Sequence, residues 1–358
     1  MINWNIHFFV FIPSILLSLI FVSCTDSDHE SCDCSIPGVR DSIAFSNPSA
    51  EKMDSLKLLQ AVSAADGSAE IYSLLVMRNG NIISENYFKG FASRDSFSVR
   101  SVTKSVIGAL VGIGVKQGMI RDENKRIKDY FPEYFSTVSD PLKREITIKH
   151  LLTMTSGFQW NETADRLYGD YMESAILLPM SDKPGEVFNY NSSNPHLLSG
   201  ILTKTSGQST FDFAKTNLFG PLDITVTRWD RDPQGYYLGG TGLYMTARDM
   251  AKIGFLHQNQ GCYFGRSILC SEWVESATSD RLPGLDSDYG YLWWIMSTGG
   301  HKTAYAYGYG GQMIYVIDDL DLVVVFTANP NVNAQTALNT RNLEDSILNS
   351  FIIPAVQL

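Results

Sequence analysis

Residues 101–115 read Ser-Val-Thr-Lys-Ser-Val-Ile-Gly-Ala-Leu-Val-Gly-Ile-Gly-Val, and they indicate the architecture more strongly than any other segment. From residue 105 onward it is apolar on almost every side of a helical wheel, which predicts a helix in the middle of a protein. Residues three apart share a helical face, so we expect the Lys104 amine within reach of the Ser101 hydroxyl. We place Ser101 at the helix N-terminus, where unpaired N–H groups and the helix dipole favour negative charge. A serine held beside a buried amine is typical of an activated nucleophile of the serine–lysine kind.

The S-x-x-K pattern is short, and the chain contains it twice. Ser49-Ala50-Glu51-Lys52 also fits, but it lies in a polar stretch and is better interpreted as a helix N-cap with solvated charges. The same interpretation is the alternative for Ser101. A surface lysine should have polar neighbours along its helix face, however, and the helix after Ser101 offers almost none. The pattern therefore favours a nucleophile at Ser101.

Five segments, in this order, carry a resemblance to a known family. They are Arg100–Ser105, Ile148–Gly157, Pro184–Asn194, Gly239–Ala251 and Tyr307–Gln312. Together they resemble the β-lactamase-related serine hydrolases, which include class C β-lactamases, D-alanyl-D-alanine carboxypeptidases, penicillin-binding-protein-like esterases and 6-aminohexanoate-dimer hydrolases. The resemblance implies an α+β fold of the β-lactamase/transpeptidase type, with the site in a cleft between a sheet and a helical region.

The resemblance also implies a second base. Tyr190 stands at the position of the family's tyrosine, and a phenol beside a cationic lysine is a suitable acid or base. Without the family, a buried structural tyrosine is the default interpretation. Ser192 occupies the third position of this motif, where Asn is commoner, and its polar contact to the substrate could instead come from Asn191 or Asn194.

Acyl transfer needs N–H donors for the tetrahedral oxyanion. One is expected from Ser101, and the resemblance places the other near Tyr309, Gly310 and Gly311. A glycine-rich β-turn is the alternative, and both can hold because glycine lets a backbone approach a ligand closely. The segment lacks the K-T-G of true β-lactamases and penicillin-binding proteins, which favours esters or amides without a carboxylate. Arg100 or Lys302 could supply a cation from elsewhere.

Several aromatic residues could line an apolar acyl pocket, although such residues are more often core. They are Trp160, Tyr168, Tyr171, Trp293 and Trp294. Adjacent residues of a strand face opposite sides, so only one of the last two rings can point to a given face. His150 is interpreted as structural. No G-x-S-x-G occurs, so an α/β-hydrolase elbow is absent.

Composition limits the partners and cofactors. The chain has 358 residues, is 44% hydrophobic and carries a net charge of −10 without a Lys/Arg cluster, which argues against a nucleic-acid partner. Its six histidines are scattered and no H-E-x-x-H occurs, so we expect no metal and no other cofactor.

The N-terminus indicates export. Residues 8–22 form a short apolar run that resembles a signal peptide, here residues 1–23. Ser23-Cys24 resembles a lipoprotein processing site, which predicts lipidation of Cys24 and a membrane anchor in the bacterial cell envelope. The alternative is an ordinary secretory signal. Residues 24–50 are then predicted to be a flexible tether, and residues 51–358 the hydrolase domain.

Export permits disulfides. Cys262 and Cys270 flank a short turn and could form a bridge, whereas Cys32 and Cys34 are too close for an easy mutual bond.

Hydrophobic patterns predict the main elements. Helices are expected at residues 51–64 and 336–351, and strands at 71–77, 82–88, 289–296, 313–317 and 322–326. This order predicts one antiparallel sheet built from both chain ends, with a mostly helical region inserted. We expect an exported serine hydrolase acting on a small ester or amide, rather than an efficient β-lactamase or DD-peptidase. The alternative is an inactive member that binds cell-wall peptide or a protein, and the oligomeric state is left open.

Overall fold

The computed structural model describes residues 1, 34 and 42–357. The predicted signal peptide beyond Met1, the lipidation site Cys24 and Cys32 lie outside these residues. Among the described residues, no helix is long and apolar enough to cross a membrane.

A seven-stranded sheet joins the two ends of the chain, in the order β1-β3-β2-β11-β10-β9-β8. Its neighbours are antiparallel, except that β1 runs parallel to β3. The strands are β1 (Ala44–Phe45), β2 (Ile71–Arg78), β3 (Asn81–Tyr87), β8 (Trp294–Thr298), β9 (His301–Gly308), β10 (Gln312–Ile317) and β11 (Leu322–Ala328). The predicted sheet from both termini is confirmed, because β2 pairs with β11 at the centre, with Val76 opposite Val324.

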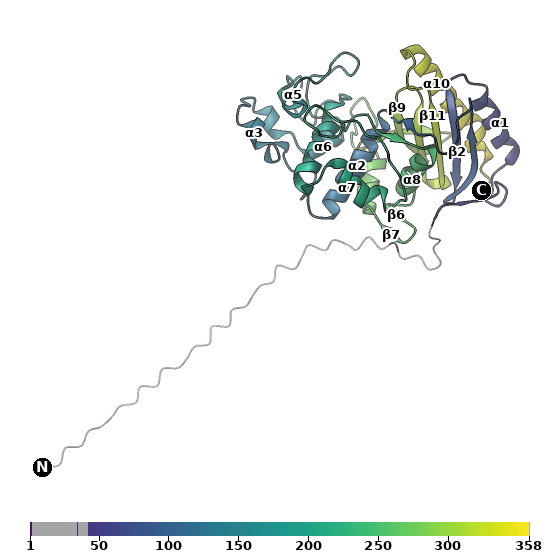
Figure 1. The fold of residues 1–358 in the computed structure, drawn as a ribbon, viewed down its shortest axis with the longest axis horizontal. Coiled ribbons are helices and arrows are strands. Elements are labelled where there is room, and N and C mark those ends of the chain that lie inside the picture. Colours follow the sequence, from purple (N-terminus) through teal and green to yellow (C-terminus); the bar gives the residue numbers. More distant parts are fainter. Residues whose placement is uncertain (2–33, 35–41, 358) are drawn as a thin grey trace. The chain divides into compact units, whose positions relative to one another are not determined.

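Helices cover the sheet and fill the inserted region (Figure 1). The helices are α1 (Ser55–Asp66), α2 (Val102–Lys116), α3 (Pro132–Phe135), α4 (Ile148–Leu152), α5 (Tyr171–Leu177), α6 (Ser193–Ser206), α7 (Thr210–Ala214), α8 (Ala247–Gln258), α9 (Ser271–Thr278), α10 (Ala334–Ile347) and α11 (Ile353–Ala355). Two short ribbons complete the fold, one formed by β4 (Phe97–Ser98) and β5 (Tyr244–Met245), the other by β6 (Cys262–Tyr263) and β7 (Arg266–Ser267). In Figure 1, α1 and α10 lie on one side of the sheet, and α8 lies on the other.

The two faces of the sheet bury separate hydrophobic cores. Successive side chains of a strand point to opposite faces. In β2, Leu75 and Met77 accordingly join the core on the α2 and α8 side, while Leu74 and Val76 join the core on the α1 and α10 side. This two-sided burial explains why β2 is apolar along its length instead of alternating.

Helix α2 lies in the interior, as its apolar sequence predicts. Its residues are buried from Val102 to Gly114. A Cβ at Gly112 would fall 2.4 Å from the indole nitrogen of Trp273, so the glycine lets that ring pack against the helix. The Trp273 indole N–H donates to the Gly108 carbonyl at 3.1 Å. The nucleophile motif thus stands on a tightly packed element.

Several element boundaries differ from expectation. Helix α1 begins at Ser55 because Asp54 caps its N-terminus; Ser49, expected to be a cap, instead donates to Asn47 in an exposed turn. Strand β8 begins at Trp294 rather than at residue 289. Strand β9, at residues 301–308, was not delimited from the sequence. The closing helix ends in a π-helical turn at Leu348–Ile352.

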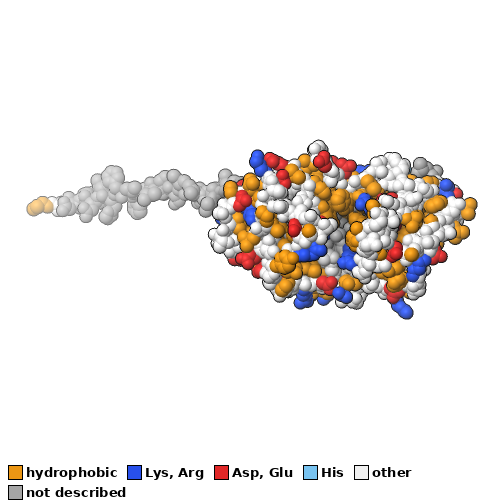
Figure 2. All heavy atoms as spheres, turned by 90° about the horizontal axis from the view of Figure 1, so that it is seen from above, with side chains coloured by type: hydrophobic (Ala, Val, Ile, Leu, Met, Phe, Trp, Pro, Cys, Tyr) orange, Lys and Arg blue, Asp and Glu red, His pale blue; other side chains and the backbone are white. Residues whose placement is uncertain are grey.

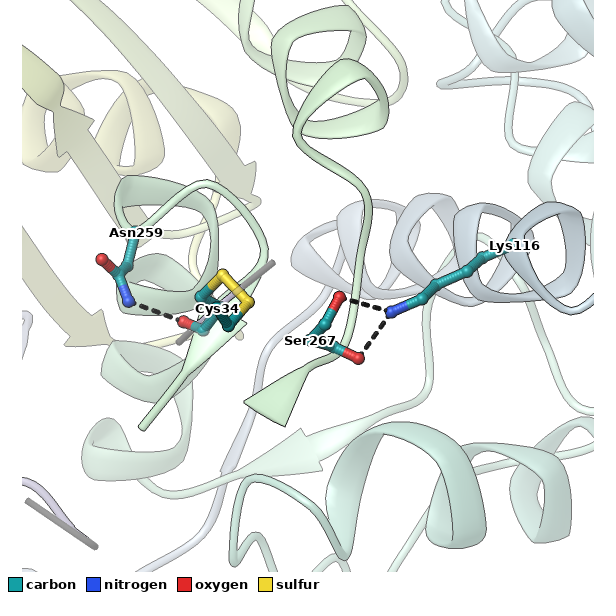
Figure 3. The surroundings of a disulfide bond; sticks show 5 residues. Cys34, Lys116, Asn259 and Ser267 are labelled. Carbon is teal, nitrogen blue, oxygen red and sulfur yellow. Dashed lines mark hydrogen bonds between the residues drawn. A yellow bond between two sulfur atoms is a disulfide. The ribbon is translucent and has the colours of Figure 1, made fainter. Parts of the chain in front are cut away.

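The predicted disulfide between Cys262 and Cys270 is wrong. Cys262 bonds Cys34, with 5.7 Å between their Cα atoms, and not Cys270 (Figure 3). In the same region the Lys116 ammonium, at the end of α2, donates to the carbonyl and hydroxyl of Ser267. Since Cys34 is bonded to the domain and Ala44–Phe45 pairs with β3, the fold includes residues assigned above to the tether.

Candidate active site

Ser101 is the N-cap residue of α2, and its side chain makes no capping hydrogen bond. The hydroxyl instead accepts from the Lys104 ammonium at 3.0 Å and is hydrogen-bonded to the Tyr190 side chain. The preceding residue, Arg100, has a φ of 50°, in the left-handed region that non-glycine residues rarely adopt. The Ser101 hydroxyl therefore contacts the side chains of Lys104 and Tyr190 instead of capping the backbone N–H groups of α2.

Lys104 is almost fully buried, with 1% of its surface exposed. Its ammonium donates to the Ser101 hydroxyl at 3.0 Å, the Ser192 hydroxyl at 2.8 Å and the Gly240 carbonyl at 2.8 Å. Burial lowers the pKa of Lys104 to about 8, and the Glu162 carboxylate opposes this shift. Loss of water disfavours the ammonium more than the single carboxylate stabilises it, so a larger fraction of Lys104 than of a surface lysine is neutral and able to accept a proton near neutral pH.

The Gly240 carbonyl is brought to the site by the β4–β5 ribbon. Strand β4 ends three residues before Ser101, and it pairs with β5, which begins four residues after Gly240. The Val99 N–H also donates to the Leu243 carbonyl at 3.0 Å. A Cβ at Gly239 would lie 1.9 Å from the Pro195 carbonyl oxygen, so only glycine lets this segment lie against α6.

Tyr190 comes from the segment before α6 and lies in an aromatic group. Its ring stacks on Trp294 at 5.2 Å between centroids and 26° between planes, and it meets Tyr289 edge-on. Burial raises the pKa of Tyr190 above its usual value, although the hydrogen bond with Ser101 acts in the opposite direction. The phenol is therefore neutral in the resting site and can donate or relay a proton.

Ser192, the third residue of the tyrosine motif, contacts Lys104 and a carboxylate that sequence reasoning missed. It is the N-cap residue of α6, again without a capping hydrogen bond from its side chain. Its hydroxyl donates to Glu162, and its backbone N–H donates to the same carboxylate at 2.9 Å. Glu162 lies 4.0 Å from the Lys104 nitrogen. The Ser192 hydroxyl is thus engaged within the site, whereas the sequence suggested a contact to substrate.

Glu162 is held by the loop between α4 and α5. The Trp160 indole N–H donates to it at 2.7 Å, so this ring, proposed above as pocket lining, also orients the carboxylate. The Asn189 side chain in turn donates to the carbonyls of Phe158 and Trp160. Glu162 lies in no short motif, and we found no signal in the sequence that marks it.

The turn between β9 and β10 borders the residues that precede Ser101. A Cβ at Gly308 would lie 2.3 Å from the Val99 carbonyl oxygen and 3.1 Å from the Arg100 Cβ. Gly310 and Gly311 have φ values of 93° and 104°, so the glycine-rich turn is present. The exposed Tyr309, which precedes these two glycines, donates its hydroxyl proton to the Val332 carbonyl at 2.9 Å. Gly308 therefore lies against the two residues that precede Ser101; the second oxyanion donor at Tyr309 stays a prediction.

Asn191 and Asn194, the alternatives to Ser192 for a polar contact to the substrate, point their side chains into the protein. The Asn191 side-chain oxygen accepts from the backbone and hydroxyl of Ser193. The Asn194 amide lies against the Met154 sulfur at 3.7 Å. Both side chains are buried and organise the start of α6.

The remaining candidates divide between core, surface and site. Trp293 is fully buried against His257, and its neighbour Trp294 stacks on Tyr190, so the two rings diverge as predicted. Tyr168 is exposed, and Tyr171 contacts His196. His150 forms a capping box with Thr147 at the start of α4, as a structural residue would.

The cations suggested near the third motif are engaged elsewhere. The Arg100 guanidinium donates to the Pro330 carbonyl and to Asn331, and the Lys302 ammonium donates to Ser279. Arg341 of α10 lies 4.9 Å from the Tyr307 ring centroid and donates to the Tyr305 hydroxyl. Within residues 42–357, no cluster of three or more His, Cys, Asp or Glu is suited to a metal.

Comparison with known proteins identifies the family. The sequence model of the Beta-lactamase family matches residues 59–347. The chain belongs to the beta-lactamase family. Its sequence is 27% identical, over 71% of each chain, to a protein named 6-aminohexanoate-dimer hydrolase from Paenarthrobacter ureafaciens. It is 26% identical to an uncharacterised protein of Alkalihalophilus pseudofirmus, over 72% of this chain and 83% of the relative.

Solved structures show the same fold for this beta-lactamase family chain. The octameric penicillin-binding protein homologue from Pyrococcus abyssi matches with a TM-score of 0.62 and 18% identity, covering 81% of this chain and 75% of the other. EstCE1, described as a hydrolase with promiscuous acyltransferase activity, matches with a TM-score of 0.63 and 15% identity, over 80% and 96% of the two chains. The β-lactamase/transpeptidase-like fold expected from the motifs is thereby confirmed.

Proposed function

We propose that this chain is a serine hydrolase that forms an acyl-enzyme on Ser101, with Lys104 and Tyr190 sharing the proton transfers. The observation that carries the proposal is the Ser101 hydroxyl. It is not used to cap its helix, and it lies 3.0 Å from a buried amine and in hydrogen-bond contact with a phenol. A serine needs such neighbours to lose its proton at neutral pH.

In acylation, the Ser101 oxygen attacks the substrate carbonyl carbon while its proton passes to neutral Lys104 or, through it, to Tyr190. The carbonyl oxygen becomes an oxyanion that accepts from the N–H groups of Ser101 and Tyr309. Collapse of the tetrahedral intermediate breaks the bond to the alcohol or amine, which takes the proton from Tyr190 or Lys104 as it leaves. Water then repeats the steps on the acyl-enzyme and releases the acid and free Ser101.

The substrate class follows from the charges around the turn. A carboxylate desolvated in a cleft needs a cation or several hydrogen bonds. Arg100 and Lys302 are engaged with other groups, and residues 307–312 carry no charge. An ester or amide without a carboxylate beside the scissile bond suits this site better than a β-lactam. The name of the Paenarthrobacter relative makes aminohexanoate oligomers natural members of a substrate panel.

Labelling with a fluorophosphonate probe tests the nucleophile. We expect labelling at Ser101, and its loss together with hydrolysis in Ser101→Ala. Ser49→Ala, the second S-x-x-K serine, is the matched control and should leave both unchanged. Full activity of Ser101→Ala would exclude the mechanism, and a folded wild type that neither labels nor hydrolyses any substrate would favour the alternative binding role.

A substrate panel tests the class. It contains short p-nitrophenyl esters, nitrocefin, D-amino-acid amides and aminohexanoate oligomers. We expect kcat/KM to be much higher for the esters than for nitrocefin. Rapid nitrocefin hydrolysis beside negligible esterase activity would show that the missing cation does not decide specificity.

We also propose that the protein is exported and anchored by a lipid on Cys24. The support is the apolar run at residues 8–22, followed by Ser23 and Cys24. Cys24→Ser should release the protein from membrane fractions of its bacterial host without loss of hydrolase activity. An unmodified N-terminus at another residue, found by mass spectrometry of the wild type, would contradict the anchor.

A further inference from the structure

The chain between β11 and α10, residues 329–333, accepts hydrogen bonds from the residue that precedes the nucleophile. We call these five residues the connecting segment. One guanidinium nitrogen of Arg100, Nη2, donates to the Pro330 carbonyl at 2.7 Å and to the Asn331 side-chain oxygen at 2.9 Å. Arg100 has a φ of 50°, a left-handed conformation that costs free energy for a residue with a Cβ. Such a conformation persists only where the surroundings hold it, and these hydrogen bonds hold the Arg100 side chain.

The same connecting segment holds the glycine-rich turn between β9 and β10. The Tyr309 hydroxyl donates to the Val332 carbonyl at 2.9 Å. A Cβ at Gly310 would lie 2.3 Å from the Asn329 carbonyl oxygen, so the absence of a side chain lets the turn lie directly against the segment. The connecting segment therefore contacts both the turn and the Arg100 guanidinium.

The connecting segment is itself fixed to the domain. The backbone N–H and the side-chain amide of Asn329 donate to the carbonyl and the carboxylate of Glu70, each at 2.9 Å. The Asn331 N–H donates to the Asn329 side-chain oxygen at 3.0 Å. At the other end, the Asn333 side chain accepts from the Thr336 N–H and caps α10. The segment can therefore act as a rigid support for the groups that bind to it.

We propose that Arg100 is a positioning residue for the oxyanion hole, because it ties the backbone at Ser101 to the segment that also holds the turn at Tyr309. The two N–H groups predicted to bind the oxyanion belong to Ser101 and Tyr309. Such donors are effective when their spacing is fixed before the negative charge develops. Arg100 acts through the backbone and does not touch the substrate. The proposal rests on the proposed function at Ser101.

Close packing transmits the position of Arg100 to its neighbours. A Cβ at Gly308 would lie 2.3 Å from the Val99 carbonyl oxygen and 3.1 Å from the Arg100 Cβ, so the end of β9 packs on the backbone before Ser101. The Arg100 carbonyl accepts from the Thr103 hydroxyl at 2.6 Å. Without its side-chain hydrogen bonds, the left-handed Arg100 could relax, and the Ser101 N–H would turn with it.

The alternative role for Arg100 is attraction of an anionic substrate. Its Nη2 is engaged by the connecting segment, and its Nε is buried without a hydrogen-bond partner among the described residues, so both nitrogens are turned into the protein. On the face of the molecule in Figure 2, basic and acidic side chains are interspersed. A neutral substrate separates the two roles, because it gains no charge attraction from a guanidinium.

The experiment uses a neutral p-nitrophenyl ester and a neutral alkyl boronic acid, whose tetrahedral serine adduct mimics the oxyanion intermediate. Arg100→Gln should lower kcat by about 10- to 100-fold with little change in KM, since acylation and deacylation both pass through an oxyanion. The boronic acid should bind more weakly by a similar factor. Arg100→Lys should recover part of the loss. Asn331→Ala, which keeps the Pro330 carbonyl, should lose less. Arg121→Gln, at a side chain that is 80% exposed, is the matched control and should match wild type.

A double variant tests whether the two connections serve one purpose. Tyr309→Phe removes the bond to Val332 but keeps the backbone N–H of residue 309, and it should also lower kcat. Combined with Arg100→Gln, it should lower kcat by less than the product of the two single losses, because either change already frees the spacing of the donors. A fully multiplicative loss would contradict a shared support.

Other outcomes overturn the proposal. Unchanged kcat and boronic-acid affinity in Arg100→Gln would exclude it, as would a lower melting temperature as the sole effect. A rise of KM confined to an anionic ester would assign Arg100 to substrate attraction. If Arg100→Gln does not fold, unchanged kcat and boronic-acid affinity in both Arg100→Lys and Asn331→Ala would exclude positioning. Fluorophosphonate labelling separates this test from that of the proposed function. A wild type that labels beside a fully active Arg100→Gln removes positioning alone, and a wild type that neither labels nor hydrolyses any substrate removes both.

Discussion

The Lys104 ammonium donates a 2.8 Å hydrogen bond to the carbonyl of Gly240, which lies 136 residues further along the chain. The segment holding that carbonyl lies against α6 because Gly239 has no side chain. A Cβ there would stand 1.9 Å from the Pro195 carbonyl oxygen and 2.8 Å from the His196 nitrogen. This hydrogen bond of Lys104 therefore depends on a glycine outside the S-x-x-K motif.

Gly239→Ala should push this segment away from α6 and break the bond to Lys104. We expect kcat/KM to fall at least about tenfold, and the free energy of unfolding to fall by about 1–3 kcal/mol, from overpacking. Gly67→Ala is the control, because Gly67 is exposed and a Cβ there would have its nearest neighbour at 3.5 Å. Enzyme assays and urea denaturation measure both effects, and a folded, fully active Gly239→Ala would contradict the argument.

Tyr190→Phe should remove the phenol while keeping the ring on Trp294. Because the hydroxyl is proposed to exchange protons with Ser101 and the leaving group, we expect kcat to fall by about 10²–10⁴. The melting temperature should change little, since the stacking remains. Tyr168→Phe, at an exposed tyrosine, should retain activity. Equal activities of the two variants would assign Tyr190 a packing role only.

Glu344→Gln should stabilise the protein at neutral and alkaline pH. Burial raises the pKa of Glu344 well above its usual value, and among the described residues neither carboxyl oxygen has a hydrogen-bond partner. The folded protein therefore holds this proton more tightly than the unfolded chain does. Wild-type stability falls as pH rises from about 4.5 through the folded pKa.

The glutamine variant should lack this fall. We expect stability equal to wild type near pH 4, and greater by roughly 1–3 kcal/mol once wild-type Glu344 would ionise. Thermal melts across this pH range measure the difference. Glu272→Gln, at an exposed glutamate of α9, is the control. A gain that is the same at every pH would show that the charge of Glu344 is not its cause.

Cys262→Ser should destabilise the domain, because its disulfide to Cys34 links residues 228 positions apart. Loss of a native disulfide costs about 2–5 kcal/mol. Cys270→Ser should leave the bond intact, and non-reducing peptide mapping checks the pairing directly. A Cys262–Cys270 peptide in the wild type would contradict the structure.

Local patterns identified most of the sheet. Strands β2, β3, β10 and β11 lie within one or two residues of their predicted bounds, because buried strands consist of short apolar runs between turn residues. Strand β9 was harder to delimit. His301, Lys302 and Thr303 interrupt its apolar character, and its pairing with β8 and β10 compensates for that.

The central helix and the pairing of Ser101 with Lys104 could be predicted from the sequence alone. Both depend on residues a few positions apart, whose geometry a helix sets directly. The order of the five family-like segments also indicated Tyr190 and the glycine-rich turn between β9 and β10. The hydrogen bond between Lys104 and Ser192, which are 88 residues apart, and the contact of Ser192 with Glu162 are visible only in the folded chain. Those contacts depend on how α6 and the α4–α5 loop pack around α2, and no spacing within one segment encodes that packing.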